Sequence, residues 1–346
     1  FIWVCLEYLR SNLDFLALPF PILAHSQHQH LYIIQFVSYT GAYGLSFLIV
    51  LANCALSAAI LTIWSRYKKN TLPAGRPLSS RFAISMILVT LALVGLTLYY
   101  GQAAVSSPLA GESIKVSVLQ GNIDREKKAD PRKYADFIMQ RYAELTTEAA
   151  ADKPDLIVWP EAATPGFVLK NGSLLNQVVA LVKSVNTHFL LGSSEYPKIS
   201  DQPLKPEDVG NTALLFSPEG KVLGQYLKIR LIPFAEYVPY EDVIPWPRFI
   251  LSEKKSGFEV PGKEHTLFDL NGKKFGVVIC SEGAFPGLFR KFVMGGADFM
   301  LNITNEGWFG ETALSQKVAA SVFRAVENRI SIARATNTGV SCFIDP

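Results

Sequence analysis

Three residue types, each at the end of an apolar strand-like run, could together carry out nucleophilic chemistry. Cys280 follows the run at residues 274–279, and the small residues after it lead to Pro286, which suits the start of a helix. A cysteine attacks a carbonyl as the thiolate, so it needs a base nearby and a cation for the developing charge. A cysteine at the end of a buried strand is otherwise ordinary packing, so these partners must come from elsewhere in the chain.

A glutamate and a lysine are the candidate partners. Glu161 ends the run at residues 157–160, and a buried carboxylate is costly unless it is paired or acts as a base. Lys228 ends the next such run and could stabilise an oxyanion, with Glu236 eight residues later to orient it or share its proton. Taken singly, a loop glutamate and a solvated lysine explain these positions as well. Because each residue closes a separate run, an α/β sheet could bring all of them together with Cys280 at one edge.

The elements that must position these residues form an alternating pattern from residue 113 onward. Strands are expected at residues 114–123, 155–159, 189–193, 213–216, 222–226, 275–279, 299–303 and 340–344, and helices at 132–151, 174–185, near 289 and at 315–328. Mixed alternation of this length predicts one α/β domain over residues 106–346. A proline-rich apolar stretch at residues 243–264 interrupts it and is a candidate lid facing a membrane.

Residues 1–105 are more apolar and predict a transmembrane helical region. Residues 82–105 contain no Asp, Glu, Lys or Arg, and as a helix they would extend about 36 Å across a hydrocarbon core of roughly 30 Å. A second span is expected near 42–64, with residues 1–9 as the tail of an earlier one. Because the chain opens inside an apolar run and stops just after a strand-like segment, we expect a fragment cut at both ends.

The segment between the two spans is basic, with Arg66, Lys68, Lys69, Arg76 and Arg81 and no acidic residue among them. The positive-inside rule puts such a segment in the cytoplasm, which places everything after residue 105 on the outer side. A solvated basic loop that carries no information on sidedness is the alternative.

Composition argues against several other classes of function. The net charge is only +3 and no basic stripe with interleaved aromatic residues is present, so we expect no nucleic-acid partner. The four cysteines, at positions 5, 54, 280 and 342, have no paired spacing, which predicts neither a disulfide framework nor a zinc site. The histidines at 25, 28 and 30 share no helical face and have no carboxylate partner, which favours an interfacial loop over a metal site.

Four motifs make the chain resemble the carbon-nitrogen hydrolase (nitrilase) superfamily. They are Trp-Pro-Glu at 159–161, Lys followed by Pro-Phe-x-Glu-Tyr-Val-Pro within 228–239, Ile-Cys-x-Glu at 279–282, and Asn-x-x-Trp-Phe-Gly at 305–310. With apolar helices ahead of them, they are similar to those of its membrane branch, the apolipoprotein N-acyltransferases. The resemblance runs from Trp3 to Gly339 and implies a nitrilase-like αββα sandwich domain of the α/β class preceded by transmembrane helices.

Carried over residue by residue, the resemblance implies roles for the motif positions. It makes Glu161 the general base, Lys228 the oxyanion stabiliser and Cys280 the nucleophile, and it implies no metal and no cofactor. The supporting or substrate-binding positions that it adds are Glu236, Glu282, Asn305, Trp308 and Phe309. For the Trp-Phe pair, a place in the core is an equal alternative.

The resemblance also implies a reaction and its partners. A fatty acyl chain would pass from a membrane phospholipid, phosphatidylethanolamine above all, through a cysteine thioester to the α-amino group of a diacylglyceryl apolipoprotein. The enzyme would be a multi-pass protein of the bacterial inner membrane with a periplasmic catalytic domain, and an apolar lid at residues 244–251 would keep water out. The alternatives are a membrane-tethered amidase, in which water resolves the thioester, and a catalytically silent membrane receptor or part of a transporter, which has no use for all three catalytic groups.

Several positions depart from the pattern of the family. Arg230 and Lys317 stand where histidines are usual, Ser281 where tyrosine is frequent, and Glu306 and Gly307 where aspartate and alanine are common. Ala129 lies in a loop that often has an aromatic residue. None of these removes a catalytic group, so they bear on acyl-chain and head-group preference.

Overall fold

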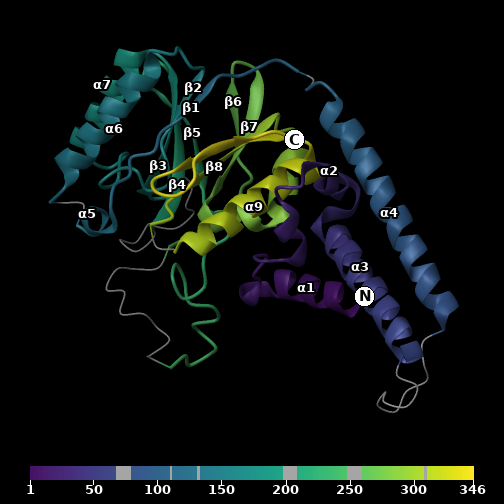
Figure 1. The fold of residues 1–346 in the computed structure, drawn as a ribbon. Coiled ribbons are helices and arrows are strands. Elements are labelled where there is room, and N and C mark those ends of the chain that lie inside the picture. The colour runs from purple at the N-terminus through teal and green to yellow at the C-terminus, as the bar shows by residue number, and fades with distance from the viewer. Residues whose placement is uncertain (68–78, 110, 131–132, 198–208, 248–258, 308–309) are drawn as a thin grey trace. The chain divides into compact units, whose positions relative to one another are not determined.

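A computed structural model describes residues 1–67, 79–109, 111–130, 133–197, 209–247, 259–307 and 310–346 of the chain. Contacts within the chain divide it into two units, Phe1–Ala110 and Gly111–Pro346. The first unit is helical and the second contains all the described strands (Figure 1).

The N-terminal unit is built around two long apolar helices. Its helices are α1 (Ile2–Asn12), α2 (Leu31–Ile34), α3 (Val37–Tyr67) and α4 (Ser80–Ser106), with the 3-10 segments η1 (Asp14–Leu16) and η2 (Leu23–Gln27). The α3 helix is broken at Gly41, where φ is 65° and ψ is 177°, a conformation that a residue without Cβ adopts at little cost. The regular part of α3 therefore begins after Gly41, close to the predicted start at residue 42.

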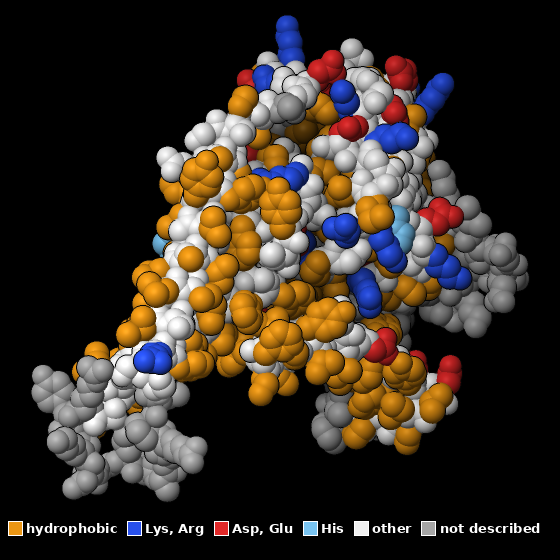
Figure 2. All heavy atoms as spheres, turned by 90° about the vertical axis from the view of Figure 1, so that its right-hand side faces the viewer, with side chains coloured by type: hydrophobic (Ala, Val, Ile, Leu, Met, Phe, Trp, Pro, Cys, Tyr) orange, Lys and Arg blue, Asp and Glu red, His pale blue; other side chains and the backbone are white. Residues whose placement is uncertain are grey.

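Both long helices have the length and composition of membrane spans, over Val37–Ser65 and Ser80–Ser106. This confirms the two long apolar helices expected from the sequence. Only 22% and 17% of their most apolar windows are buried inside the structure, so neither resembles the core helix of a soluble protein. Figure 2 shows hydrophobic side chains gathered on the face of the molecule where α4 lies. Leu88, Leu91 and Leu96 of α4 are more than half exposed. Exposed apolar surface of this extent marks contact with a membrane or another protein.

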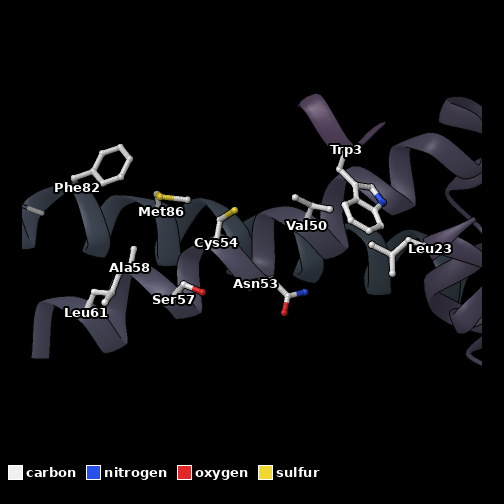
Figure 3. Close-up of a pocket in the computed structure, with 10 residues that line it drawn as sticks. All are labelled: Trp3, Leu23, Val50, Asn53, Cys54, Ser57, Ala58, Leu61, Phe82 and Met86. Atoms are coloured by element: carbon white, nitrogen blue, oxygen red, sulfur yellow. The ribbon is translucent and has the colours of Figure 1, made fainter. Parts of the chain in front are cut away.

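An apolar pocket of about 490 Å³ lies within this unit, between α1, α3 and α4 (Figure 3). Trp3 closes one end, Val50 and Leu61 line it from α3, and Phe82 and Met86 line it from α4. The only amide side chain in its lining is Asn53, whose nitrogen donates to the carbonyl of Ile49 in the preceding turn.

The C-terminal unit contains two five-stranded sheets. The first has β1 (Val116–Val118), β2 (Leu156–Val158), β3 (His188–Glu195), β4 (Gly210–Phe216) and β5 (Val222–Leu227), in that spatial order. The second has β6 (Leu267–Leu270), β7 (Lys273–Ile279), β8 (Phe299–Thr304), β9 (Ser331–Thr336) and β10 (Cys342–Ile344), again in order. In each sheet three neighbouring strands are parallel, β1 to β3 and β7 to β9, and the others are antiparallel.

Side-chain alternation along the strands shows how the layers are packed. In β2, Leu156 and Val158 share a buried cluster with residues of the second sheet such as Val277, whereas Ile157 packs in a separate cluster with Val178 of α7. Successive side chains of a strand point to opposite faces, so one face of the first sheet meets the second sheet and the other meets helices. The helices of this unit are α5 (Arg125–Ala129), α6 (Ala135–Ala150), α7 (Gly172–Val185), α8 (Pro286–Met294) and α9 (Glu311–Asn328), with the 3-10 turn η3 (Cys280–Ala284). The result is the αββα sandwich that the resemblance implied (Figure 1).

Most elements lie where the sequence pattern predicted them, and the differences have identifiable causes. The first strand is shorter than predicted, three residues in place of residues 114–123, and β6 and β9 were not predicted. The β9 sequence contains Arg334, which is 1% exposed, and this charge hides an otherwise apolar run. Of the candidate lid, residues 248–258 lie outside the described part of the chain, as do Lys68, Lys69 and Arg76 of the basic segment.

Candidate active site

Cys280 is the first residue after β7, at the start of η3, with a φ of 54°. A left-handed backbone costs a non-glycine residue on the order of 1 kcal/mol and persists only where the surroundings hold it. The last five residues of β7 are buried and fix one side of this turn. Pro286 begins α8 and fixes the other, as its position in the sequence predicted. The thiol is therefore presented at a tight strand-to-helix turn.

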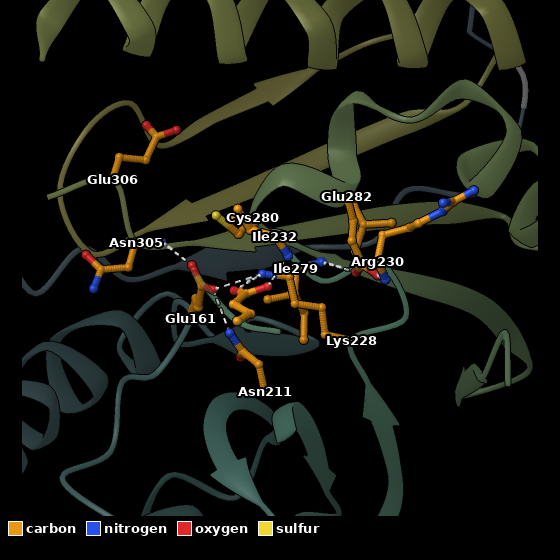
Figure 4. Close-up of polar contacts among 12 residues, drawn as sticks. Glu161, Asn211, Lys228, Arg230, Ile232, Ile279, Cys280, Glu282, Asn305 and Glu306 are labelled. Atoms are coloured by element: carbon orange, nitrogen blue, oxygen red, sulfur yellow. Dashed lines mark hydrogen bonds and ion pairs between the residues drawn. The ribbon is translucent and has the colours of Figure 1, made fainter. Parts of the chain in front are cut away.

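Glu161 lies three residues beyond β2 and is 6% exposed. Its Oε1 accepts a 2.7 Å hydrogen bond from Asn211 Nδ2 on β4, and its Oε2 accepts one of 2.7 Å from the backbone N–H of Asn305, just after β8 (Figure 4). The carboxylate is thus held from both sheets. Gly192 on β3 makes room for this segment, because a Cβ there would lie 2.3 Å from the carbonyl oxygen of Pro160.

Lys228 is fully buried and lies between two carboxylates. Its Nζ donates to Glu236 Oε1 at 2.6 Å and lies 3.9 Å from Glu161 Oε1, while Glu236 Oε2 accepts the backbone N–H of Ile232 at 2.7 Å. Burial acts to lower the pKa of Lys228, but the charges of Cys280 when it is a thiolate, of Glu161 and of Glu236 outweigh it and raise that pKa above its ordinary value. Lys228 is therefore a permanent ammonium group.

The electrostatic surroundings of Cys280 favour the neutral thiol at rest. Desolvation, and then the charge of Glu161, raise the pKa of Cys280 above its usual value, and the ammonium groups of Lys228 and Lys317 only partly oppose this. Because the thiolate is not preformed, attack requires a base that removes the proton as the bond forms. Glu161, whose charge acts on the Cys280 thiol, is the candidate for that base.

Glu282 connects the two segments that carry Lys228 and Cys280. It is fully buried, and it accepts hydrogen bonds from the Tyr226 hydroxyl at 2.9 and 3.0 Å and from three backbone N–H groups, those of Ile229 at 2.7 Å, Arg230 at 2.9 Å and Ile279 at 2.8 Å. Burial raises the pKa of Glu282, and the backbone donors oppose the rise. This carboxylate fixes the end of β7 against the chain that follows β5.

Four of the residues singled out from the sequence therefore lie together, namely Glu161, Lys228, Cys280 and Glu282 (Figure 4), and Glu236 joins them through its contact with Lys228. Asn305 joins them through its backbone, while its side-chain oxygen accepts from Asn337 at 3.1 Å. Trp308 and Phe309 lie outside the described residues. Among the departures from the family pattern, Arg230 places its guanidinium 5.4 Å from the ring centre of Phe285.

Sequence reasoning missed the role of Asn211 and the contacts of Lys317. Asn211 was a lone amide in an apolar strand, and a buried amide needs a partner, which is the signal that could have found it. Lys317, noted as a departure, has its Nζ 3.9 Å from Cys280 Sγ. Among the described residues, no three His, Cys, Asp or Glu side chains are grouped so as to hold a metal ion.

Comparisons with known proteins show the family to which the chain belongs. The family model for carbon-nitrogen hydrolases matches residues 115–346, and that for the apolipoprotein N-acyltransferase N-terminal domain matches residues 1–55. An apolipoprotein N-acyltransferase of Geobacter metallireducens is 36% identical over 99% of this chain and 63% of its own length, and one of Chlorobaculum tepidum is 27% identical over 100% and 66%. The chain thus spans slightly less than two thirds of the length of these relatives.

Among solved structures, the chain is similar to an amidase from Nesterenkonia sp., with 21% sequence identity and a TM-score of 0.49. The match covers 69% of this chain and 84% of the amidase chain. The family models, by contrast, cover the catalytic unit and the first helices. The chain belongs to the carbon-nitrogen hydrolase family, in the branch that carries the apolipoprotein N-acyltransferase N-terminal domain.

Proposed function

We propose that the protein transfers a fatty acyl chain from a membrane phospholipid to the α-amino group of the N-terminal diacylglyceryl cysteine of an apolipoprotein. The observation that carries the proposal is the arrangement of Glu161, Lys228 and Cys280. The carboxylate is fixed by two donors at 2.7 Å and lies 3.9 Å from the lysine, whose ammonium group interacts electrostatically with Cys280. The likeness of 99% of this chain to an apolipoprotein N-acyltransferase supports the choice of lipid substrates.

In the first half-reaction, the ester carbonyl of the phospholipid is the electrophile. Glu161 takes the proton from the Cys280 thiol as Sγ attacks the carbonyl carbon, and the Lys228 ammonium stabilises the negative charge that develops on the carbonyl oxygen. When the tetrahedral intermediate collapses, the C–O bond to the glycerol breaks. Glu161 returns its proton to the departing lysophospholipid alkoxide, and the acyl chain remains as a thioester on Cys280.

In the second half-reaction, the amine of the acceptor attacks the thioester. Glu161 removes a proton from the attacking nitrogen, Lys228 again stabilises the oxyanion, and the C–S bond breaks to give the amide. The proton held by Glu161 then returns to the Cys280 sulfur, so the enzyme is restored without any change in oxidation state. One carboxylate thus serves as base and acid in both steps.

The two long apolar helices support a place in the bacterial inner membrane. We propose that α3 and α4 span it and that the unit Gly111–Pro346 lies on the periplasmic side, because the segment between the helices is basic. Fusion of alkaline phosphatase after Pro346 is expected to be active, and fusion of β-galactosidase at the same point inactive. The reverse pattern would contradict the orientation.

The test of the reaction is mass spectrometry of the full-length enzyme, incubated in detergent with phosphatidylethanolamine. A hydroxylamine-sensitive fatty-acyl adduct on Cys280 is expected in the wild type, and it should disappear when a synthetic diacylglyceryl peptide with a free amine is added. Cys280→Ala should show no adduct. Cys342→Ala, which alters another partly buried cysteine of the same unit, should be acylated like the wild type.

A tethered amidase is the outcome that would overturn the proposal. Family membership favours it as the second candidate, since water in place of the amine would resolve the same thioester. It predicts no stable adduct from phosphatidylethanolamine, Cys280 still open to alkylation, and hydrolysis of small amides by the wild type but not by Cys280→Ala.

A further inference from the structure

A second lysine approaches the nucleophile from a different element. Lys317 lies on α9 and is 9% exposed, and its Nζ is 3.9 Å from Cys280 Sγ and 3.6 Å from Glu306 Oε1. Its ammonium group therefore has the reactive sulfur and a carboxylate among its neighbours. The reaction described above does not use this group.

Glu306, in turn, is held by an arginine of the second sheet. Arg334 Nη2 lies 2.5 Å from Glu306 Oε1 and Nη1 lies 3.4 Å from Oε2, and Nη1 also donates to the carbonyl of Val340 at 2.9 Å. Glu306 and Arg334 are each 1% exposed. Such a buried charge network is costly unless its members are well paired.

The fold leaves room for this network at a turn. Gly339, just before β10, has a φ of 105°, and a Cβ at this position would lie 2.3 Å from Glu306 Oε2. Both the backbone conformation and the close approach require glycine there. The placement of Glu306 is thus built into the backbone and does not depend on side chains alone.

Formal charges show why the sulfur benefits from a second cation. Glu161, Lys228 and Glu236 comprise two anions and one cation, so this group is already negative before the thiol loses its proton. Lys317, Glu306 and Arg334 comprise two cations and one anion, which leaves a positive charge on the other neighbour of the sulfur. A thiolate formed between the two groups is stabilised by the second and not by the first.

We propose that Lys317 is a second cationic partner of the Cys280 sulfur, held in place by Glu306, that stabilises the thiolate during attack and when the thioester is broken. This role rests on the proposed function of Cys280 as the nucleophile. Lys317 would be a catalytic residue, since it contacts a reacting atom, and Glu306 and Arg334 would be positioning residues.

Other charged groups packed against the Cys280 turn are already committed to partners. Arg324 of α9 donates to the Ala284 carbonyl at 3.0 Å and pairs with Glu327 at 2.9 Å, and Glu282 of η3 is enclosed by its four donors. Thr304 of β8 contributes a neutral hydroxyl near the sulfur. In the part of the chain that the structure describes, the charged groups that act on the sulfur are therefore Glu161, Lys228 and Lys317.

The test is the rate at which iodoacetamide alkylates Cys280 in the full-length protein in detergent, quantified by peptide mass spectrometry from pH 7 to 10. In Lys317→Met, the alkylation rate at a fixed pH below the midpoint of the pH–rate profile should fall about tenfold. Loss of an opposite charge at this distance raises the pKa of a thiol by roughly 1, which lowers the thiolate fraction by the same factor. Lys317→Arg should keep most of the rate. Lys183→Met, at an exposed position on α7, should match the wild type.

A merely structural lysine would give a different result. Lys317→Met would then lower the melting temperature while Cys280 was alkylated with the wild-type pH profile, and that result would overturn the proposal. If Lys317→Met does not unfold cooperatively, Lys317→Gln, whose amide can still donate to Glu306, carries the same test with the same two outcomes. Alkylation needs neither phospholipid nor acceptor. If the wild type is not acylated by lipid but Lys317→Met still lowers the alkylation rate, the proposed function is wrong. The role of Lys317 as a partner of the thiolate is then still supported.

Discussion

At the scale of a single residue, Lys128 shows how burial near the site destabilises a charged side chain. Its Nζ donates to the carbonyl of Ala162 at 2.5 Å, next to Glu161, the proposed general base, and Ala162 itself has a φ of 45°. Burial lowers the pKa of Lys128 to about 8, although the charge of Glu161 opposes this. The ammonium group is thus less stable in the folded protein than in the unfolded chain.

This sets the sign of a pH dependence. The folded pKa of Lys128 is about 8 and the ordinary value is 10.5, so between these values the unfolded chain binds more protons and stability rises with pH. Below pH 8 both states are protonated and the folded state bears the whole cost. Lys128→Met should therefore stabilise the protein at pH 7 by roughly 1–2 kcal/mol, after loss of one hydrogen bond, and the gain should shrink as pH rises from 8 towards 10.

Melting temperatures of the wild type and the variant across pH 7 to 10 measure this effect. Lys127→Met is the matched control, because that neighbouring lysine pairs with Asp124 at the surface. A constant difference in melting temperature between Lys128→Met and the wild type at every pH would show that the burial of Lys128 does not govern its charge.

At the scale of elements, the strand-to-helix turn at Cys280 and the hydrogen bonds of Glu282 determine where the reactive groups lie. The strand before Cys280 and the helix start at Pro286 could be predicted from the sequence, because burial and turn formation leave local signals. Asn211 and Arg334 were not, since a lone polar residue in a buried strand resembles a break in the pattern. Their partners lie 50 and 28 residues away, and no local pattern specifies such a pairing.

The hydrogen bonds that Glu282 accepts lead to a prediction at this scale. Glu282→Gln keeps the shape of the side chain but turns one acceptor oxygen into an N–H₂ group that faces backbone donors. At least one buried N–H would lose its partner, at a cost of roughly 1–3 kcal/mol in the free energy of unfolding. Because Glu282 joins the segments that carry Lys228 and Cys280, the rate of thioester formation should fall as well.

Thermal unfolding and the rate of Cys280 acylation, measured on the same preparations, test this prediction. Glu148→Gln, at an exposed position on α6, should change the free energy of unfolding by less than about 0.5 kcal/mol. Wild-type stability in Glu282→Gln would mean that the four donors to this carboxylate do not hold the two segments together.

At the scale of the whole molecule, the fold class followed from the sequence because motifs and apolar runs both bear on it. Helix composition alone predicted α3 and α4, since hydropathy over 20 residues is a strong signal. The edge strand β6 was missed because it is four residues long and one of them is Asp269. Short edge strands are stabilised by their neighbour and carry little pattern of their own.

Membrane insertion gives the prediction at this scale. Leu91 lies near the middle of α4 and is 62% exposed, so Leu91→Arg places a charge where insertion costs about 2.5–3.5 kcal/mol. The fraction of protein that resists carbonate extraction from membranes should fall. Tyr99→Arg, nearer the end of the helix, should be tolerated because a long side chain there can reach water. Equal extraction of the two variants would argue against α4 as a span.

The division of the site between two sheets has a consequence for timing. Glu161 and Lys228 follow strands of the first sheet, Cys280 follows a strand of the second, and the N–H that completes Glu161 is 144 residues further along. During synthesis the base and its lysine leave the ribosome well before the thiol. Under the proposed mechanism, Cys280 meets its base only when the second sheet packs against the first, so a newly made chain is expected to form no thioester until folding is complete.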